Sequence, residues 1–256
     1  MNFFRFLITA LRTNFRLSIA CKATFIVNVV VGIIKHGFFL AAWMFFFDLY
    51  EDIHGWTFRN LLLVYGLISI GIGTIEVFFY GLREIPQIVE SHMLDSYLVQ
   101  PQNIILNIAL SKGHIASLSD LITGLIAIIY SSVPVFSFIL LLPLSIIFMF
   151  ALYLYIGSLI FFIKNSSELI KELYRNAIII ATQPNAAYNG LLKSLTLTIL
   201  PVGFLSFFPV NFTKTSDYLY LVISYAGTLS FLAISWMLFY QGLKRYESGH
   251  LLVGKD

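Results

Sequence analysis

The chain has 256 residues, of which 59% are hydrophobic and only 11% charged, and its mean hydropathy is +0.86. A soluble domain carries roughly 25% charged residues because it must cover a water-facing surface, so this composition excludes an ordinary soluble protein and indicates a chain folded in lipid. The formal net charge is +3, and the single cysteine, Cys21, excludes an intramolecular disulfide, a cysteine-cluster metal site and an iron–sulfur site.

Residues 1–22 have the pattern of an amphipathic helix. Arg5, Arg12 and Arg16 fall on one face at 100° per residue, and apolar side chains occupy the others. This pattern predicts a helix lying in the inner headgroup layer. A cleaved signal peptide is the rival interpretation, but the first uninterrupted apolar core comes late, runs too long and lacks an obvious small-x-small cleavage site.

Apolar stretches of about 20 residues, the length that crosses a bilayer as a helix, occur five times along the rest of the chain. They fall at roughly 24–47, 60–80, 116–135, 138–163 and 217–240. A further apolar region at 177–210 is interrupted by Pro184, Pro201 and Pro209. We therefore expect one all-α membrane domain, spanning 1–256, that crosses the bilayer about six times.

The interrupted region leaves two arrangements open for the fifth crossing. Irregular backbone at membrane depth is tolerated only where protein or water satisfies it, which favours short helices at 184–210 that dip into the outer leaflet and return. The alternative is one proline-kinked span near 191–210, with the preceding residues at the inner surface. Charge does not separate the two, because only Lys193 changes sides.

Lysine and arginine are distributed unequally between the two sides. With the N-terminus inside, twelve of the sixteen basic residues fall on the inner side: Arg5, Arg12, Arg16, Lys22, Arg83, Lys112, Lys164, Lys171, Arg175, Lys244, Arg245 and Lys255. The outer side receives only Arg59, Lys193 and Lys214, and Lys35 lies within the first span. The positive-inside rule then predicts that both termini are cytoplasmic, which requires an even number of crossings.

Several ionisable residues occur at membrane depth. Lys35 and His36 lie in the first span and Glu76 in the second, while Asp120 enters the third. Each such group costs about 2.5–3.5 kcal/mol on insertion scales and normally faces the bundle, water or a partner charge. Lys35 and Glu76 form a conceivable interhelical pair, either as part of a substrate path or as a structural pair. A Lys35 side chain that snorkels to the interface is the remaining alternative.

Enzymatic motifs are absent from the sequence. It contains no P-loop, no His-Glu-x-x-His and no Gly-x-Ser-x-Gly, and its five histidines have no ligand spacing. If ATP drives this protein, the ATPase is therefore a separate polypeptide. The small residues around Gly66 and Gly71–Gly73 lie inside an apolar span, where they permit close helix packing.

The longest hydrophilic connection between spans is Gly81–Lys112, on the inner side. Pro86 can open a short helix there, with Glu84 or Glu90 near its first turns, and Pro101 ends the pattern. Its apolar positions include Ile85, Ile88, Val89, Met93, Leu94 and Leu98. Such a helix can lie on lipid or dock into a groove of a partner, and packing under its own bundle is an equally good interpretation of the periodicity.

This connection also resembles a motif of the membrane permeases of type-2 ABC exporters, in particular their small bacterial six-span branch. These permeases carry Gly-x-Leu-Glu/Asp-x-x-Leu-x-x-Pro between the second and third spans. Here the matching positions are Leu94, Asp95, Leu98 and Pro101. The glycine is replaced by His92 and the usual basic residue before the proline by Gln100. Gly55-Trp56-Thr57 after the first span, and the proline-punctuated segment before the last, are similar to the same branch.

The resemblance implies a role for each segment of the chain and the subunits with which it would assemble. Residues 1–22 would be the elbow helix, 84–98 the coupling helix that seats in the nucleotide-binding subunit, and 184–210 outer re-entrant helices, with a fifth span near 167–182. The residues implied in coupling are Glu84, Ile88, Val89, Leu94, Asp95, Leu98 and Pro101. Two permeases, identical or homologous, would work with two ATPases that bind ATP and Mg²⁺, in the bacterial inner membrane and without nucleic acid.

Two other classes of function are compatible with a polytopic membrane protein. An ion-driven secondary transporter, or a substrate-binding membrane subunit of an importer, would often show inverted repeats and helices broken at mid-membrane; no internal repeat is visible here. An intramembrane enzyme acting on lipid would need several acid, base or metal-binding groups clustered near one interface, and such groups are sparse in this sequence.

Overall fold

The computed structural model describes residue 13 and residues 22–50, 55–163, 166–183, 198 and 200–248. The expected interfacial helix at 1–22 therefore lies outside the described residues, apart from Thr13 and Lys22. The same holds for Pro184 and most of the first half of the 184–210 segment. The regular elements of the described chain are α-helices joined by short 3-10 helices, as the composition predicts.

Four helices are long and apolar enough to cross a membrane, judged by length and composition. They are Lys22–Leu49, Phe58–Glu90, Val135–Phe161 and Tyr218–Leu243, which contain α2 (Lys22–Leu49), α3 (Phe58–Phe79), α8 (Val135–Ser158) and α12 (Tyr218–Leu243). A fifth candidate is bent by 80° at a short break, between Ile104–Leu110 (α6) and Ile115–Ser131, which ends in α7 (Leu118–Ser131). All five of the long apolar stretches expected from the sequence are thus found as helices.

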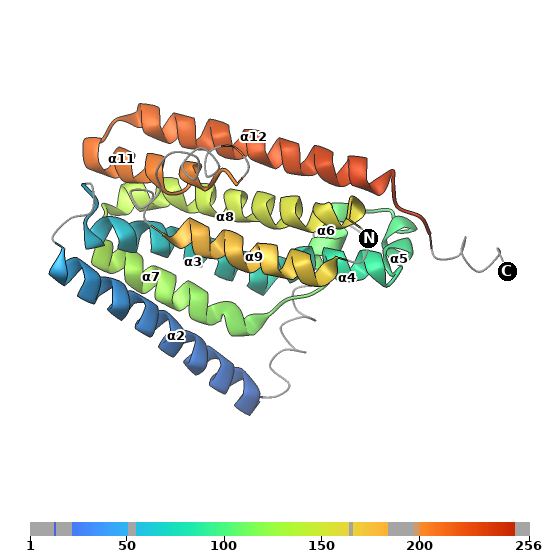
Figure 1. Ribbon diagram of the computed structural model, residues 1–256, viewed down its shortest axis with the longest axis horizontal. Helices are drawn as coiled ribbons and strands as arrows, with labels where there is room; N and C mark the ends of the chain where they lie inside the picture. Colours follow the sequence, from blue (N-terminus) through green and yellow to red (C-terminus); the bar gives the residue numbers. More distant parts are fainter. Residues whose placement is uncertain are drawn as a thin grey trace.

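The structure gives four or five candidate spans among the described residues, so the expected count of six is not confirmed. The remaining element of interest is α9 (Ser167–Thr182), which has 16 residues and carries several charges in its first half. In Figure 1, α9 runs beside α8 in the opposite direction, back toward the end of the bundle from which α8 starts.

Helix α3 forms the centre of the bundle. It packs against α7 and α8, α12 covers the other side of α8, and α2 lies at the edge against α7 (Figure 1). In the most apolar 18-residue window of the span that contains α3, 89% of the residues are buried inside the bundle. The corresponding share for α2 is only 6%. A water-soluble protein could not expose α2 in this way, and a helix facing acyl chains or another membrane subunit can.

Small residues allow α3 and α7 to touch backbone to backbone. A Cβ added to Gly66 would lie 3.0 Å from the Gly124 carbonyl oxygen, and one added to Gly124 would lie 3.0 Å from the Gly66 oxygen. A Cβ on Gly73 would lie 2.8 Å from the Leu121 amide nitrogen. The prediction that the small residues of the second span serve close helix packing is confirmed.

The two ends of the bundle are closed by different short elements. Helices α4 (Ile85–Glu90) and α5 (Leu94–Leu98) lie with α6 at one end, and α11 (Phe207–Thr215) lies at the opposite end beside the start of α12 (Figure 1). Pro201 precedes the 3-10 helix Val202–Phe204, and Pro209 is in the first turn of α11, where a missing N–H is tolerated. We call these the α4/α5 end and the α11 end.

Candidate functional site

The connection between the second and third spans folds into three short helices at the α4/α5 end. Pro86 lies in the first turn of α4, as expected from its fixed φ and its missing N–H. Ile85, Ile88 and Leu94 are buried, and Val89 is half-buried against the core. These side chains therefore hold the connection against its own bundle, as the alternative interpretation of the apolar periodicity expected.

A second set of apolar side chains on the same connection faces outward. Val99 is 84% exposed, Met93 49% and Leu98 47%, and Pro101 is also exposed. We call these four residues the α5 patch. The connection thus has an inner apolar layer that fixes it and an outer one that is available to a partner. Val99 was not among the residues predicted, because it follows the last residue of α5, where helical periodicity ends.

Asp95 ties the patch to the C-terminal end of the described chain. Its Oδ2 accepts a hydrogen bond from the Ser248 hydroxyl at 2.7 Å. Tyr246 lies nearby, and its ring contacts that of His92. Burial, together with the charge of the neighbouring Asp95, raises the pKa of the Tyr246 phenol to about 12, so this group stays neutral at physiological pH. Asp95 thus positions the connection, with its side chain turned toward the C-terminal end.

Two glutamates fix the helices of this end. Glu84 precedes α4, and its Oε2 accepts from the Lys112 ammonium at 2.7 Å, which closes the connection at its two ends. Glu90 ends α4, and its Oε1 accepts from the Ser167 backbone N–H at 2.9 Å, at the first residue of α9. A carboxylate at a helix N-terminus satisfies an otherwise unpaired N–H and complements the helix dipole. Glu90 therefore links α4 directly to α9.

The two positions that depart from the family motif have visible roles. His92 has a φ of 56°, in the left-handed region that glycine adopts without strain, which explains why a glycine is usual there. Gln100 accepts from the Asn107 side chain at 2.6 Å and donates to the Ser96 carbonyl at 3.1 Å. The amide thus joins α5 to α6, where the motif would place a cation.

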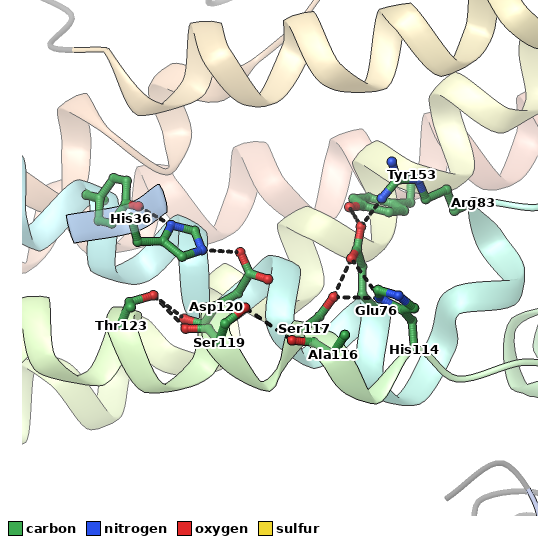
Figure 2. Close-up of polar contacts among 11 residues, drawn as sticks. His36, Glu76, Arg83, His114, Ala116, Ser117, Ser119, Asp120, Thr123 and Tyr153 are labelled. Carbon is green, nitrogen blue, oxygen red and sulfur yellow. Dashed lines mark hydrogen bonds and ion pairs between the residues drawn. The ribbon is translucent and has the colours of Figure 1, made fainter. Parts of the chain in front are cut away.

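Inside the bundle, Glu76 of α3 is the centre of a polar network (Figure 2). Its side chain is buried and pairs with Arg83, which comes seven residues later, about two turns along. The Tyr153 hydroxyl of α8 donates to Oε1 at 2.9 Å, and the Ser117 hydroxyl donates to Oε2 at 2.5 Å. His114 completes the network, 3.9 Å from Oε2. The carboxylate is therefore satisfied by three elements at once, as a buried charge requires.

Lys35, which the sequence offered as a conceivable partner of Glu76, is not among the residues of this network. The ion pairs of Glu76 in the described chain are those to Arg83, just beyond the end of α3, and to His114, in the segment that leads into α7. The signal for Arg83 was present in the sequence, because a spacing of seven residues returns to the same helix face. Tyr153 and Ser117 could be found only from the packing.

A second polar pair, of buried His36 and half-buried Asp120, joins α2 to α7 (Figure 2). The Nε2 atom of His36 lies 3.1 Å from Oδ1 of Asp120, and Nδ1 shares a hydrogen bond with the Tyr65 hydroxyl of α3. This polar contact fixes an edge helix that otherwise buries little surface. Each of the two residues was noted in the sequence as an ionisable group at membrane depth, but nothing there indicated that they meet.

Between α2, α3, α7 and α9 lies a cavity of about 640 Å³. Both polar networks border it, through Glu76 and Arg83 on one side and His36 and Asp120 on the other. Lys35 also lines it. The structure thus brings the two members of the suggested Lys35–Glu76 pair to the same cavity without pairing them.

The sequence comparisons can now be set beside this geometry. The model of the ABC-2 family transporter proteins matches residues 33–249, which is most of the chain. The chain belongs to this family. No curated protein matches it.

Membership makes the chain a multi-pass membrane protein and the permease subunit of an ABC exporter, a transport subunit without catalysis of its own. ABC-2 permeases generally pair with an ABC ATPase, which agrees with the missing P-loop in this sequence. Within the described ranges, no group of three or more histidine, cysteine or acidic side chains is placed to hold a metal ion.

The residues expected to take part in coupling fall into two groups in the permease. Ile88 and Leu94 are buried, Val89 is half-buried, and Glu84 and Asp95 make polar contacts within the chain. Only Leu98 and Pro101 are exposed, together with Met93 and Val99. Leu98 and Pro101 thus belong to the exposed α5 patch, and the other expected residues are buried or make contacts within the chain.

Proposed function

We propose that this permease crosses the bacterial cytoplasmic membrane six times, with both termini cytoplasmic, and that its ATPase docks on the α5 patch. The observation that carries the proposal is the exposed patch itself, held to the bundle by buried side chains on its inner layer. A docking surface of this kind needs exposed apolar side chains at its centre and a fixed backbone beneath them.

The proposed orientation follows from the basic residues. Lys112 pairs with Glu84, just before α4, and Lys171 lies in the first half of α9, whose first residue is bonded to Glu90 of α4. Lys244 and Arg245 follow α12, which ends toward the α4/α5 end (Figure 1). Lys214 lies at the α11 end, where it donates to the Gly55 carbonyl at 2.6 Å. An excess of basic residues marks the cytoplasmic side, so the α4/α5 end faces the cytoplasm, where an ATPase can reach it.

Helix α9 is the proposed fifth crossing. Sixteen residues at about 1.5 Å each span about 24 Å, slightly less than the hydrocarbon core of about 30 Å. The charged side chains of its first half border the cavity, where water can reach them. The segment 184–210 would then return through the outer leaflet as re-entrant structure, supported by the short helical pieces that follow Pro201 and include Pro209.

Force from the ATPase would reach the cavity through Glu90. The α5 patch follows α4 directly, α4 is bonded to the first residue of α9, and α9 forms one wall of the cavity. Movement of the docked connection therefore displaces α9 relative to α2 and α3. Two such permeases, identical or homologous, would work with two ATPases, and the poorly covered outer face of α2 leaves apolar surface for lipid or a second permease.

Substitution in the α5 patch tests the docking site. Val99→Asp places a charge at the centre of the patch, so we expect the ATPase, recognised by its P-loop, to be lost from the affinity-purified complex. Val135→Asp is the matched control, because Val135 is 73% exposed but lies at the start of α8, toward the α11 end. Unchanged recovery of the ATPase with Val99→Asp would refute the docking site.

Substitution of Glu90 tests the transmission of force separately. Glu90→Ala removes the acceptor for the Ser167 amide without touching the patch, so the ATPase should still co-purify while transport per ATP hydrolysed falls. Glu90→Gln keeps an acceptor oxygen and should recover part of the coupling. Both quantities are measured in proteoliposomes, and equal coupling in Glu90→Ala and wild type would contradict the path through α9.

A further inference from the structure

The side chains that line the cavity between α2, α3, α7 and α9 indicate the chemical class of a ligand. Its volume of about 640 Å³ lies within the range of about 300–1,000 Å³ typical of small-molecule sites. We propose that it binds a single-chain amphiphile whose head carries an oxyanion, carboxylate or phosphate, and that Lys35 recognises that head. This inference rests on the proposed export function and adds the chemical class of the substrate to it.

The acidic side chains of the cavity each have a basic partner. Glu76 pairs with Arg83, and Asp120 lies 3.1 Å from His36. On α9, two pairs three residues apart form at 2.7 and 2.6 Å, Lys171 with Glu168 and Arg175 with Glu172. Each of the four carboxylates thus already has a partner from the chain itself, so a cationic ligand finds no unpaired acid in the described wall.

Lys35 is the cation that remains. It is exposed, lines the cavity and lies at the middle of α2, and across the described ranges its ammonium has no ion pair or hydrogen bond. An ammonium group at bilayer depth without a partner charge normally faces a transport path or a ligand. Its three donors suit a carboxylate or phosphate, which accepts several hydrogen bonds at once.

An apolar wall adjoins this cation. Phe39 lies one helical turn beyond Lys35 on α2, and its ring is stacked on Tyr65 with 5.1 Å between the centroids. Ile72 of α3 and Ile178 and Ile179 of α9 line the same space. Head and tail sites are therefore adjacent, which suits an amphiphile and not a hydrophilic anion such as a sugar phosphate.

The first half of α9 supplies a polar route to this site. Glu168, Lys171, Glu172 and Arg175 are spaced at i, i+3, i+4 and i+7, so they form one stripe, and all four border the cavity. The opposite face of α9 is buried through Ile170, Tyr174 and Ala177. A charged head that enters beside α9 therefore meets polar side chains at the wall of the cavity.

The binding test uses the full chain in phosphatidylcholine nanodiscs, without ATPase. A photoreactive diazirine analogue of palmitate should cross-link to α2 or α9. Unlabelled palmitate and hexadecyl phosphate should compete for this labelling, and hexadecanol and hexadecylamine should compete at least about tenfold less well. The two anions also separate the carboxylate from the phosphate as the preferred head. Lys35→Gln should reduce labelling about tenfold, and Lys35→Arg should retain it.

Lys22→Gln is the matched control, because Lys22 is an exposed lysine on the same helix at its far end. Size-exclusion profiles of all variants check that they fold. Equal competition by the alcohol, stronger competition by the amine, or unchanged labelling of Lys35→Gln would each overturn the inference. Failure of the ATPase to co-purify, with anion-selective labelling intact, would instead refute the proposed ATP-driven function and leave the ligand site standing.

Discussion

A few single residues in this permease adopt a backbone conformation that helical periodicity does not predict. His92 is one of three non-glycine residues with positive φ in the described chain, together with Ser132 and Ser216. It separates α4 from α5 and so sets the direction in which the α5 patch faces. An L-residue in the left-handed region is disfavoured by about 1–2 kcal/mol, a strain that the permease carries at its proposed docking surface.

His92→Gly should therefore stabilise the fold. The loss of strain exceeds the extra entropy that glycine gives the unfolded chain, about 0.4–1 kcal/mol, so we expect the free energy of unfolding to rise by about 0.5–1 kcal/mol. His92→Val should lower it, because a β-branched residue is strained further at this φ. Titration with a denaturing detergent, followed by circular dichroism, measures both; a less stable glycine variant would show that the contact of His92 with Tyr246 is worth more than the strain.

The polar side chains show where residue-level prediction stops. The sequence marked Lys35, His36, Glu76 and Asp120 as ionisable groups at membrane depth, and the structure gathers all four around one cavity. Some of the partners of Glu76 were not predictable, because they lie far away in the sequence: Tyr153 is 77 residues from Glu76, and Ser117 is 41. A pattern along one helix specifies a face, and only the packing specifies what that face meets.

At the scale of elements, the contact of α3 with α7 depends on the absence of side chains. A Cβ on Gly124 would lie 2.7 Å from the Ile70 side chain and 2.9 Å from the Ile70 amide nitrogen. A side chain can rotate away, but the backbone atom cannot move without displacing α3. The two helices must therefore separate to admit even one methyl group.

Gly124→Ala should destabilise the permease by about 1–3 kcal/mol, the usual effect of overpacking. Gly37→Ala is the matched control, because a Cβ at Gly37 meets nothing within 4 Å. Alanine is the better helix former by about 1 kcal/mol, so the control should be neutral or stabilising. Thermal unfolding in detergent compares the two variants. Equal effects would mean that the contact between α3 and α7 can accommodate an additional methyl group.

The short elements were harder to predict than the long ones. Long apolar helices follow from composition, since roughly 20 apolar residues have few other structures in lipid. In the 81–112 connection, periodicity predicted an apolar stripe but not its partner. Leu94 and Leu98 lie on the same short helix with the same side-chain type, yet one is fully buried and the other 47% exposed. The shape of the bundle beneath them decides this, and the sequence pattern does not contain it.

At the scale of the whole molecule, the position of the fifth crossing depends on α9, with a span near 191–210 as the alternative. If α9 crosses, its first residues and its last lie on opposite sides of the membrane. If α9 stays on the inner surface, both of its ends are cytoplasmic. Its buried stripe packs against the centre of the bundle beside α8 and α3, which favours a crossing.

Labelling of single cysteines in a Cys21→Ser background distinguishes these arrangements. With a membrane-impermeant maleimide applied to spheroplasts, we expect Gln183→Cys, at the end of α9, and Ser132→Cys, after α7, to be labelled. Glu168→Cys and Ser96→Cys should be labelled only in inside-out vesicles. Each of these positions is at least partly exposed, so detergent should make all four reactive and serve as the control.

The labelling of Glu168→Cys and Gln183→Cys, at the two ends of α9, distinguishes the arrangements, and the other two positions serve as references. Ser132 and Ser96 fix the outer and inner reference signals at the two ends of the bundle. Labelling of Gln183→Cys with the outer reference establishes α9 as the fifth crossing. Labelling of both α9 positions with the inner reference would leave the charged stripe on the membrane surface, and the cavity would then lie open to the cytoplasm instead of being walled within the bilayer.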